Sequence, residues 1–231
     1  MPPKSMCALT PRLTPRETRL VGRLRTPQQV QRFLNDLPYN DEPLPGGATL
    51  RSFRGVVKHW SAHCMEAALA AAVILEYRKY PPLVLSLESV DHLDHVLFVY
   101  RRSRHWGSVA RSRDPGLHGR RPVFRTVRDL VLSYVDTYID LTGRIVGYAV
   151  VDLRLLGRYD WRFSTRNIWR AERLLQDSPH RPIRSSDRRI ARLRRQFRAF
   201  KKQYPNRAPL YYKDQERWSE IPQGPWGPEE S

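Results

Sequence analysis

Cys64 is the residue of this chain best suited to nucleophilic chemistry. It is one of two cysteines among 231 residues, and it precedes the helical run Met65-Glu66-Ala67-Ala68-Leu69. The positive end of a helix dipole stabilises a thiolate, which is the reactive form of cysteine. A cysteine at the start of a helix is therefore a candidate nucleophile for attack on a carbonyl carbon.

Two residues that could assist this thiol lie at the ends of predicted strands. His95 begins the apolar run 95–100, and Asp114 follows the run 106–111. A hairpin turn centred at 104/105 places His95 opposite Asp114, and a turn centred one residue earlier makes them diagonal neighbours. The sequence leaves this register open, but side chains alternate with period two, so both registers put the pair on one face. Asp114 is then expected to accept a hydrogen bond from the imidazole and fix its tautomer.

Acyl transfer also needs hydrogen-bond donors for the oxygen that becomes negative in the transition state. The backbone N–H of Cys64 is one candidate donor. The second donor is expected from an upstream side chain, and the sequence does not choose among Asn40, Trp60 and His63.

The elements that must position these residues follow from hydrophobic periodicity. Helices are predicted over 27–35, 61–80, 167–175 and 187–203, and a further one begins at the capping box of Thr126 and Asp129. Strands are predicted over 83–87, 95–100, 106–111 and 144–152. A helix packed on an antiparallel sheet is an α+β plan.

The chain length of 231 residues favours one sizeable domain with additions. Residues 1–25 lack apolar periodicity and are expected to form a flexible N-terminal arm. Residues 26–160 are expected to form the α+β core, residues 161–204 a C-terminal helical extension, and residues 205–231 an irregular tail.

The segment 60–152 resembles the transglutaminase-like branch of the papain-like fold of cysteine proteases. The matching pieces are Ser61-Ala62-His63-Cys64-Met65-Glu66-Ala67-Ala68, Asp94-His95-Val96-Leu97-Phe98-Val99 and Trp106-Gly107-Ser108-Val109-Ala110-Arg111-Ser112-Arg113-Asp114-Pro115. The resemblance implies that Cys64 is the nucleophile, His95 the general base and acid, and Asp114 the orienting residue of a catalytic triad. It also implies a hydrolase or acyltransferase that acts on a protein or peptide amide without a cofactor.

Simpler interpretations of the same residues exist. A lone cysteine on an alanine-rich helix is often a small buried apolar residue. A metal site is a weaker alternative, because His59, His63, His92 and His95 accompany Cys64 but form no HExxH or paired CxxC pattern. We therefore predict no metal.

Positive charge is concentrated near the C-terminus. Residues 181–207 carry eleven Lys or Arg and a single acid, Asp187, which makes ten of the eighteen net positive charges. One interpretation is a surface for nucleic acid or an acidic protein, and it supports an alternative function as a non-catalytic binding module. The favoured interpretation is an amphipathic helix that packs through Ile190, Leu193, Phe197 and Phe200.

The cysteine content and the apolar runs bear on the compartment. Cys7 and Cys64 show no disulfide spacing, so a reducing compartment is expected. No run is long enough for a membrane span and the first residues lack a signal-peptide pattern, so a cytoplasmic protein with no membrane partner is predicted.

Overall fold

The structure is a computed structural model that describes residues 13–42, 47–92 and 94–206. The α-helices of these residues are α1 (Pro15–Arg23), α2 (Pro27–Asp36), α3 (Phe53–His59), α4 (Cys64–Glu76), α5 (Val127–Val135), α6 (Trp169–Gln176) and α7 (Asp187–Gln203). The strands are β1 (Leu83–Ser89), β2 (His95–Arg102), β3 (His105–Val109), β4 (Arg120–Phe124), β5 (Ile145–Asp152) and β6 (Arg181–Pro182). Two short 3-10 helices are η2 (Pro115–Leu117) and η3 (Leu153–Leu156). The predicted α+β class is confirmed.

The six strands form one antiparallel sheet in the order β4-β3-β2-β1-β5-β6. Strands β2 and β3 pair Arg102 with His105 and Phe98 with Val109, which is the register with the turn centred one residue before 104/105. Ser103 and Arg104 form that turn with φ of 47° and 71°. Two consecutive left-handed residues are the geometry of a type I′ turn, which fits the twist of a hairpin.

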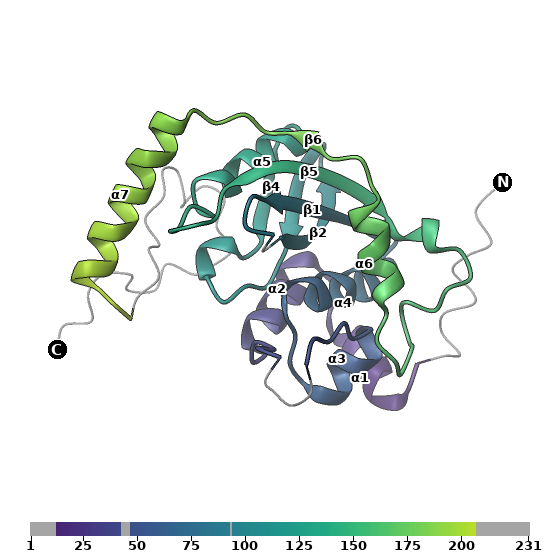
Figure 1. Cartoon of the computed structure of the whole chain (residues 1–231). Helices are drawn as coiled ribbons and strands as arrows, with labels where there is room; N and C mark the ends of the chain where they lie inside the picture. Colours follow the sequence, from purple (N-terminus) through teal and green to yellow (C-terminus); the bar gives the residue numbers. More distant parts are fainter. Residues whose placement is uncertain (1–12, 43–46, 93, 207–231) are drawn as a thin grey trace.

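Helices cover both faces of the sheet (Figure 1). Helices α1 to α4 and α6 share one hydrophobic core with Val96 and Phe98 of β2. Helix α5 lies on the opposite face, where it packs with Leu97 and Val99 of the same strand. The alternation along β2 therefore divides its apolar side chains between two cores.

Helix α4 is the buried centre of the larger core. Its residues from Met65 to Glu76 are all buried, and alanines occupy positions 67, 68, 70, 71 and 72. Small side chains let the helix backbone approach the sheet closely, and α4 packs against both β2 and α3. The helix spans a shorter range than the predicted 61–80, because His63 caps it and Cys64 is its first residue.

The N-terminal arm predicted over 1–25 is wrong for residues 15–23, which form α1. Thr14 and Glu17 make a capping box at its start, with Pro15 as the first helical residue. The carboxylate of Glu17 is buried and pairs with Arg54 of α3 at 2.9 Å. This tertiary ion pair has no signature in the local sequence. The remaining arm residues, 1–12, lie outside the described part of the chain.

The core also extends beyond the predicted boundary at residue 160. Trp161, Phe163 and Ile168 are buried in the same core as α4, together with Ala171 of α6. Residues 161–176 are therefore part of the core and not an extension. The sequence prediction also omitted α3, β4 and β6.

Helix α7 has the predicted bounds but packs less fully than expected. Ile190 is buried, whereas Leu193, Phe197 and Phe200 are half-buried. The predicted tail falls outside the described residues from position 207 onward. Among the described helices, none is long and apolar enough to cross a membrane.

Candidate functional site

The N-terminus of α4 places Cys64 beside the beginning of β2, an interior strand of the sheet. In its neutral form His63 caps the helix, because its Nδ1 atom accepts a hydrogen bond from the backbone N–H of Met65 at 3.3 Å. The Cys64 thiol is half-buried and lies 3.9 Å from the carbonyl oxygen of Asp94, the residue before β2. The helix that carries the thiol and the strand that carries His95 therefore meet at this point.

His95 is buried, and its interaction with the Cys64 thiol is one of the effects that lower the pKa of that thiol. The other side of its ring is fixed, because Nε2 lies 2.9 Å from the carbonyl oxygen of Leu117. A carbonyl only accepts, so Nε2 must carry a hydrogen and donate it. The neutral ring then has its free lone pair on Nδ1, which is the nitrogen available to the thiol.

The surroundings of Cys64 favour the thiolate. Burial acts to raise the pKa of the thiol, but hydrogen bonds with His63 and His95 outweigh it and hold that pKa near 5. An ordinary cysteine has a pKa of about 8.5. At neutral pH the thiol is therefore ionised.

Asp114 does not hydrogen-bond to His95, contrary to the prediction from the sequence. Its Oδ1 atom accepts from the backbone N–H of Gly116 at 2.8 Å and so caps η2, the short turn that ends at Leu117. Burial raises the pKa of the Asp114 carboxyl to about 6, against the opposing effects of the Gly116 hydrogen bond and the charge of Arg120. Asp114 therefore affects His95 indirectly. It caps η2, and the carbonyl oxygen of Leu117 at the end of η2 orients the His95 ring.

Arg120 holds the same turn from the other side. This fully buried side chain donates to the carbonyl oxygens of Gly116 at 2.7 Å and His118 at 2.8 Å. Its guanidinium lies 4.0 Å from the ring centre of Tyr134, whose hydroxyl also donates to His118. These contacts restrain the backbone on both sides of Leu117.

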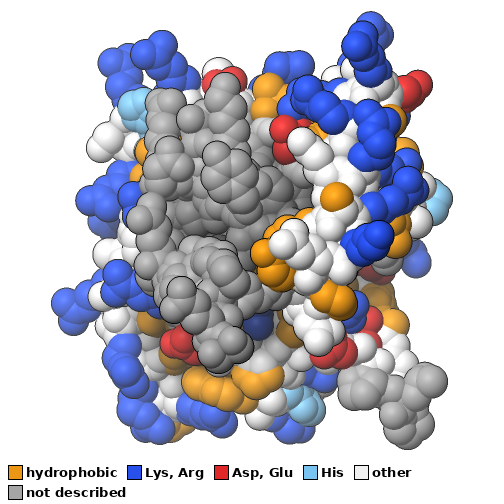
Figure 2. Space-filling view, turned by 90° about the vertical axis from the view of Figure 1, so that its left-hand side faces the viewer, with side chains coloured by type: hydrophobic (Ala, Val, Ile, Leu, Met, Phe, Trp, Pro, Cys, Tyr) orange, Lys and Arg blue, Asp and Glu red, His pale blue; other side chains and the backbone are white. Residues whose placement is uncertain are grey.

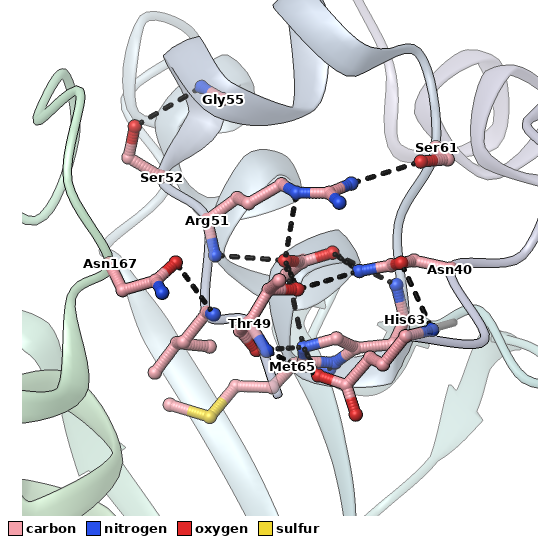
Figure 3. Close-up of polar contacts among 12 residues, drawn as sticks. Asn40, Thr49, Arg51, Ser52, Gly55, Ser61, His63, Met65 and Asn167 are labelled. Atoms are coloured by element: carbon pink, nitrogen blue, oxygen red, sulfur yellow. Dashed lines mark hydrogen bonds and ion pairs between the residues drawn. The ribbon is translucent and has the colours of Figure 1, made fainter. Parts of the chain in front are cut away.

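A buried carboxylate organises the opposite side of the site. Glu66 of α4 accepts hydrogen bonds from Asn40 Nδ2 at 3.0 Å and Thr49 Oγ1 at 3.0 Å, and also from the backbone N–H groups of Arg51 and His63 (Figure 3). The same carboxylate lies 3.7 Å from His63 Nε2. Glu66 thus fixes the segments that enter α4.

His63 is a second imidazole beside the thiol. Burial acts to lower the pKa of His63, but the hydrogen bond with Cys64 and the charge of Glu66 raise it to about 9. Its Nε2 atom lies 3.0 Å from the carbonyl oxygen of Thr49, so this nitrogen also carries a hydrogen. His63 is therefore next to the thiol both in sequence and in space.

The other two candidate oxyanion donors are engaged elsewhere. Asn40 uses its Nδ2 group for both Thr49 and Glu66, which leaves no amide N–H for a substrate. Trp60 is 41% exposed, and its ring lies 5.6 Å from that of Phe33. The Asn40 amide is therefore not arranged to donate to an oxygen at Cys64.

Tyr39 is a site residue that the sequence analysis did not select. A parallel β-bridge joins Tyr39 to Ala62, which brings its segment beside the two residues that precede the α4 helix. Its phenol interacts with the backbone N–H of Cys64, and burial raises the pKa of Tyr39 to about 12. The hydroxyl is therefore neutral at pH 7 and able to donate. Only its position next to Asn40 could have drawn attention to it.

The histidines of the metal alternative do not form a cluster. Within the described ranges, no group of three or more His, Cys, Asp or Glu side chains is arranged to hold a metal ion. Comparison of the chain with models of known protein families and with curated proteins finds no match.

Proposed function

We propose that the chain is a cysteine acyl-transfer enzyme with the plan of the transglutaminase-like branch of the papain-like fold. The observation that carries this proposal is that the Cys64 thiol lies 3.9 Å from the residue before a buried His95, whose tautomer is fixed by Leu117. A lowered thiol pKa beside a base is the arrangement that nucleophilic catalysis by cysteine requires.

In the first step, the Cys64 thiolate attacks the carbonyl carbon of an amide, and the electron pair of the C=O bond moves to the oxygen. The tetrahedral intermediate collapses as the C–N bond breaks. The departing nitrogen takes the proton that Nδ1 of His95 received from the Cys64 thiol, and it leaves as an amine. The product of this step is a thioester on Cys64.

In the second step, water or a primary amine loses a proton to His95 Nδ1 and attacks the thioester carbonyl. The C–S bond then breaks and restores the thiolate. Water as the acceptor gives hydrolysis, and an amine gives a new amide. Throughout both steps Leu117 keeps Nε2 as a donor and leaves Nδ1 free to exchange protons.

The hydroxyl of Tyr39, which contacts the backbone N–H of Cys64, supplies the donor for the oxyanion in this proposal. Both groups lie at the N-terminus of α4, where the helix dipole also favours negative charge. The proposed substrate is a protein or peptide amide.

The test is acylation by p-nitrophenyl acetate, followed by the mass of the intact protein. The wild type is expected to gain one acetyl group on Cys64, and the C7A control is expected to do the same because it keeps Cys64. C64A, which keeps Cys7, is expected to gain an acetyl group far more slowly. H95Q keeps the thiol, but its acylation and deacylation are expected to slow by about 100-fold.

Cys7 provides an internal reference in the same molecule. If Cys64 acquires acetyl groups no faster than Cys7, the proposed function is wrong and a non-catalytic binding module is favoured. A glutamine peptide supplied with a fluorescent primary amine then distinguishes the two outcomes of the second step. A fluorescent peptide indicates transfer, and a carboxylate product alone indicates hydrolysis.

A further inference from the structure

One face of α7 carries a row of cations that the proposed acyl transfer does not use. Five exposed side chains have no acidic partner in the part of the chain that the structure describes: Arg188, Arg192, Arg195, Arg198 and Lys202. At 3.6 residues per turn, these five positions fall within about a third of the helix circumference. They form a stripe opposite the apolar positions of the same helix. We call it the α7 basic face.

The helix that carries this face is docked on the domain. Arg189 binds the carboxylate of Asp136 at 2.6 and 2.8 Å. Asp187, the first residue of α7, pairs with Arg144 at 2.7 Å. Farther along the helix, Arg194 donates to the carbonyl oxygen of Thr142 at 2.8 Å. The α7 basic face therefore has a defined position and orientation relative to the sheet.

A groove of about 510 Å³ adjoins the basic face. Four arginines line it, namely Arg144, Arg194, Arg195 and Arg198, and the acid that lines it, Asp187, is already paired with Arg144. The Nε–H groups of Arg144 and Arg194 are buried and have no acceptor among the described residues. The groove thus carries excess positive charge, which favours an anion.

The length of the basic face indicates the kind of anion. Arg188 and Lys202 are fourteen positions apart, which corresponds to about 21 Å of helix. Phosphates of one duplex strand repeat about every 3.4 Å along the axis, so roughly six of them span this distance. A single phosphate could contact only one end of the row, whereas a nucleic-acid strand could contact all five cations. Guanidinium groups also match phosphate oxygens in bidentate geometry.

We propose that the α7 basic face and its arginine groove bind the phosphate backbone of a nucleic-acid strand. Figure 2 views the molecule from the α7 side, and on this face blue Lys and Arg side chains far outnumber red Asp and Glu side chains. The binding follows charge spacing along the helix and does not depend on base sequence. It is independent of Cys64 and stands whether or not acyl transfer occurs.

The test is fluorescence anisotropy with the full chain and a labelled single strand of about 20 nucleotides. Five phosphate contacts predict a slope of about −3.5 for the logarithm of the binding constant against the logarithm of salt concentration. The affinity should therefore fall by about 100-fold between about 50 and about 200 mM salt. Arg195→Gln with Arg198→Gln removes two contacts, so the slope is expected to change to about −2.1.

The matched control is Arg158→Gln with Arg166→Gln, which removes the same charge from exposed positions away from α7. This control is expected to keep the wild-type salt slope, and both variants are expected to keep Cys64 reactivity. Three results would overturn the proposal. The first is an unchanged salt slope in the Arg195/Arg198 variant, and the second is an equally large change of slope in the control. The third is competition by inorganic phosphate or polyglutamate that is as effective as competition by unlabelled strand.

Discussion

The ring of His95 donates from Nε2 to the carbonyl oxygen of Leu117 across 2.9 Å, and this bond determines which nitrogen faces Cys64. The usual orienting group in a cysteine or serine triad is a side chain such as aspartate or asparagine. Here the acceptor is a backbone carbonyl, and it is held by the Asp114 cap on one side and by Arg120 on the other. The imidazole is therefore oriented by a neutral acceptor. A charged Asp114 lies nearby without a direct bond.

The first prediction concerns the pH dependence of Cys64 reactivity. The rate of alkylation by iodoacetamide follows the thiolate fraction, and the pKa of Cys64 is lowered to about 5. The rate should rise about tenfold per pH unit below this value and be constant above about pH 6. Cys7 in the same protein should instead continue to gain reactivity toward about pH 8.5. Peptide mapping after limited alkylation measures both cysteines at once.

Two variants separate the contributions of the neighbouring histidines. H95Q keeps an amide donor for the Leu117 carbonyl but removes the charge, and H63S keeps a helix-capping oxygen but removes the imidazole. Each is expected to raise the midpoint of Cys64 alkylation by about one to two pH units. A midpoint that stays near 5 in both variants would contradict the assigned cause of the lowered pKa.

The second prediction concerns Asp114, whose folded-state pKa of about 6 lies above its ordinary value of 3.8. The folded protein therefore binds this proton more tightly than the unfolded chain does. The stability from this group is fully present below about pH 4 and is lost as the pH rises through about 6. D114N removes the charge but keeps an oxygen for Gly116. It should match the wild type at about pH 4 and exceed it by on the order of 2 kcal/mol at about pH 7.

Urea denaturation at the two pH values measures this difference. D114N should also keep the alkylation rate of Cys64, because Leu117 still orients His95. D114A, which loses the cap of η2, is expected to lower both stability and reactivity. A large loss of reactivity in D114N would show instead that the carboxylate acts on His95 directly.

Local signals in the sequence were sufficient for several elements. Thr26 with Pro27 and Thr126 with Asp129 predicted helix starts that the structure has at the same residues. The strands of the hairpin were predicted, and one of the two allowed registers is the observed one. These features depend on capping groups and on hydrophobic alternation, which are properties of contiguous residues.

The parts of the site that were not predicted depend on contacts between distant segments. The acceptor for His95 is the backbone carbonyl of Leu117. Every residue has such a carbonyl, so the residue types do not indicate which one accepts. Tyr39 reaches the site through a bridge to Ala62, and Glu17 stabilises α1 through Arg54. Periodicity and capping patterns contain no information on such pairs. Tertiary structure was needed to find them.

The third prediction concerns Glu66, the buried acceptor at the start of α4. Four donors converge on its carboxylate, from Asn40, Thr49, Arg51 and His63. E66Q keeps the size but replaces one acceptor oxygen with an NH₂ group that faces these donors. The free energy of unfolding is expected to fall by about 3 kcal/mol in urea denaturation. E172Q on α6 is the control, and an equal change in both variants would contradict the role given to Glu66.

The fourth prediction separates the proposed oxyanion donor from the nucleophile. Alkylation by iodoacetamide displaces iodide directly and forms no tetrahedral oxyanion, whereas acylation by an ester passes through one. Y39F removes the hydroxyl beside the Cys64 backbone N–H but keeps the ring. Acylation of Cys64 by p-nitrophenyl acetate is therefore expected to slow by about 100-fold, while alkylation at pH 7 stays at the wild-type rate.

The ratio of the two rates is the informative quantity, because any general disturbance of the thiol would slow both reactions together. Y138F is the matched control, since Tyr138 is another tyrosine whose pKa is affected by the charge of Cys64. Its ratio should remain that of the wild type. If Y39F leaves the ratio unchanged, the oxyanion is stabilised by groups other than Tyr39. The neighbouring His63, which already contacts the thiol, is then the next donor to test.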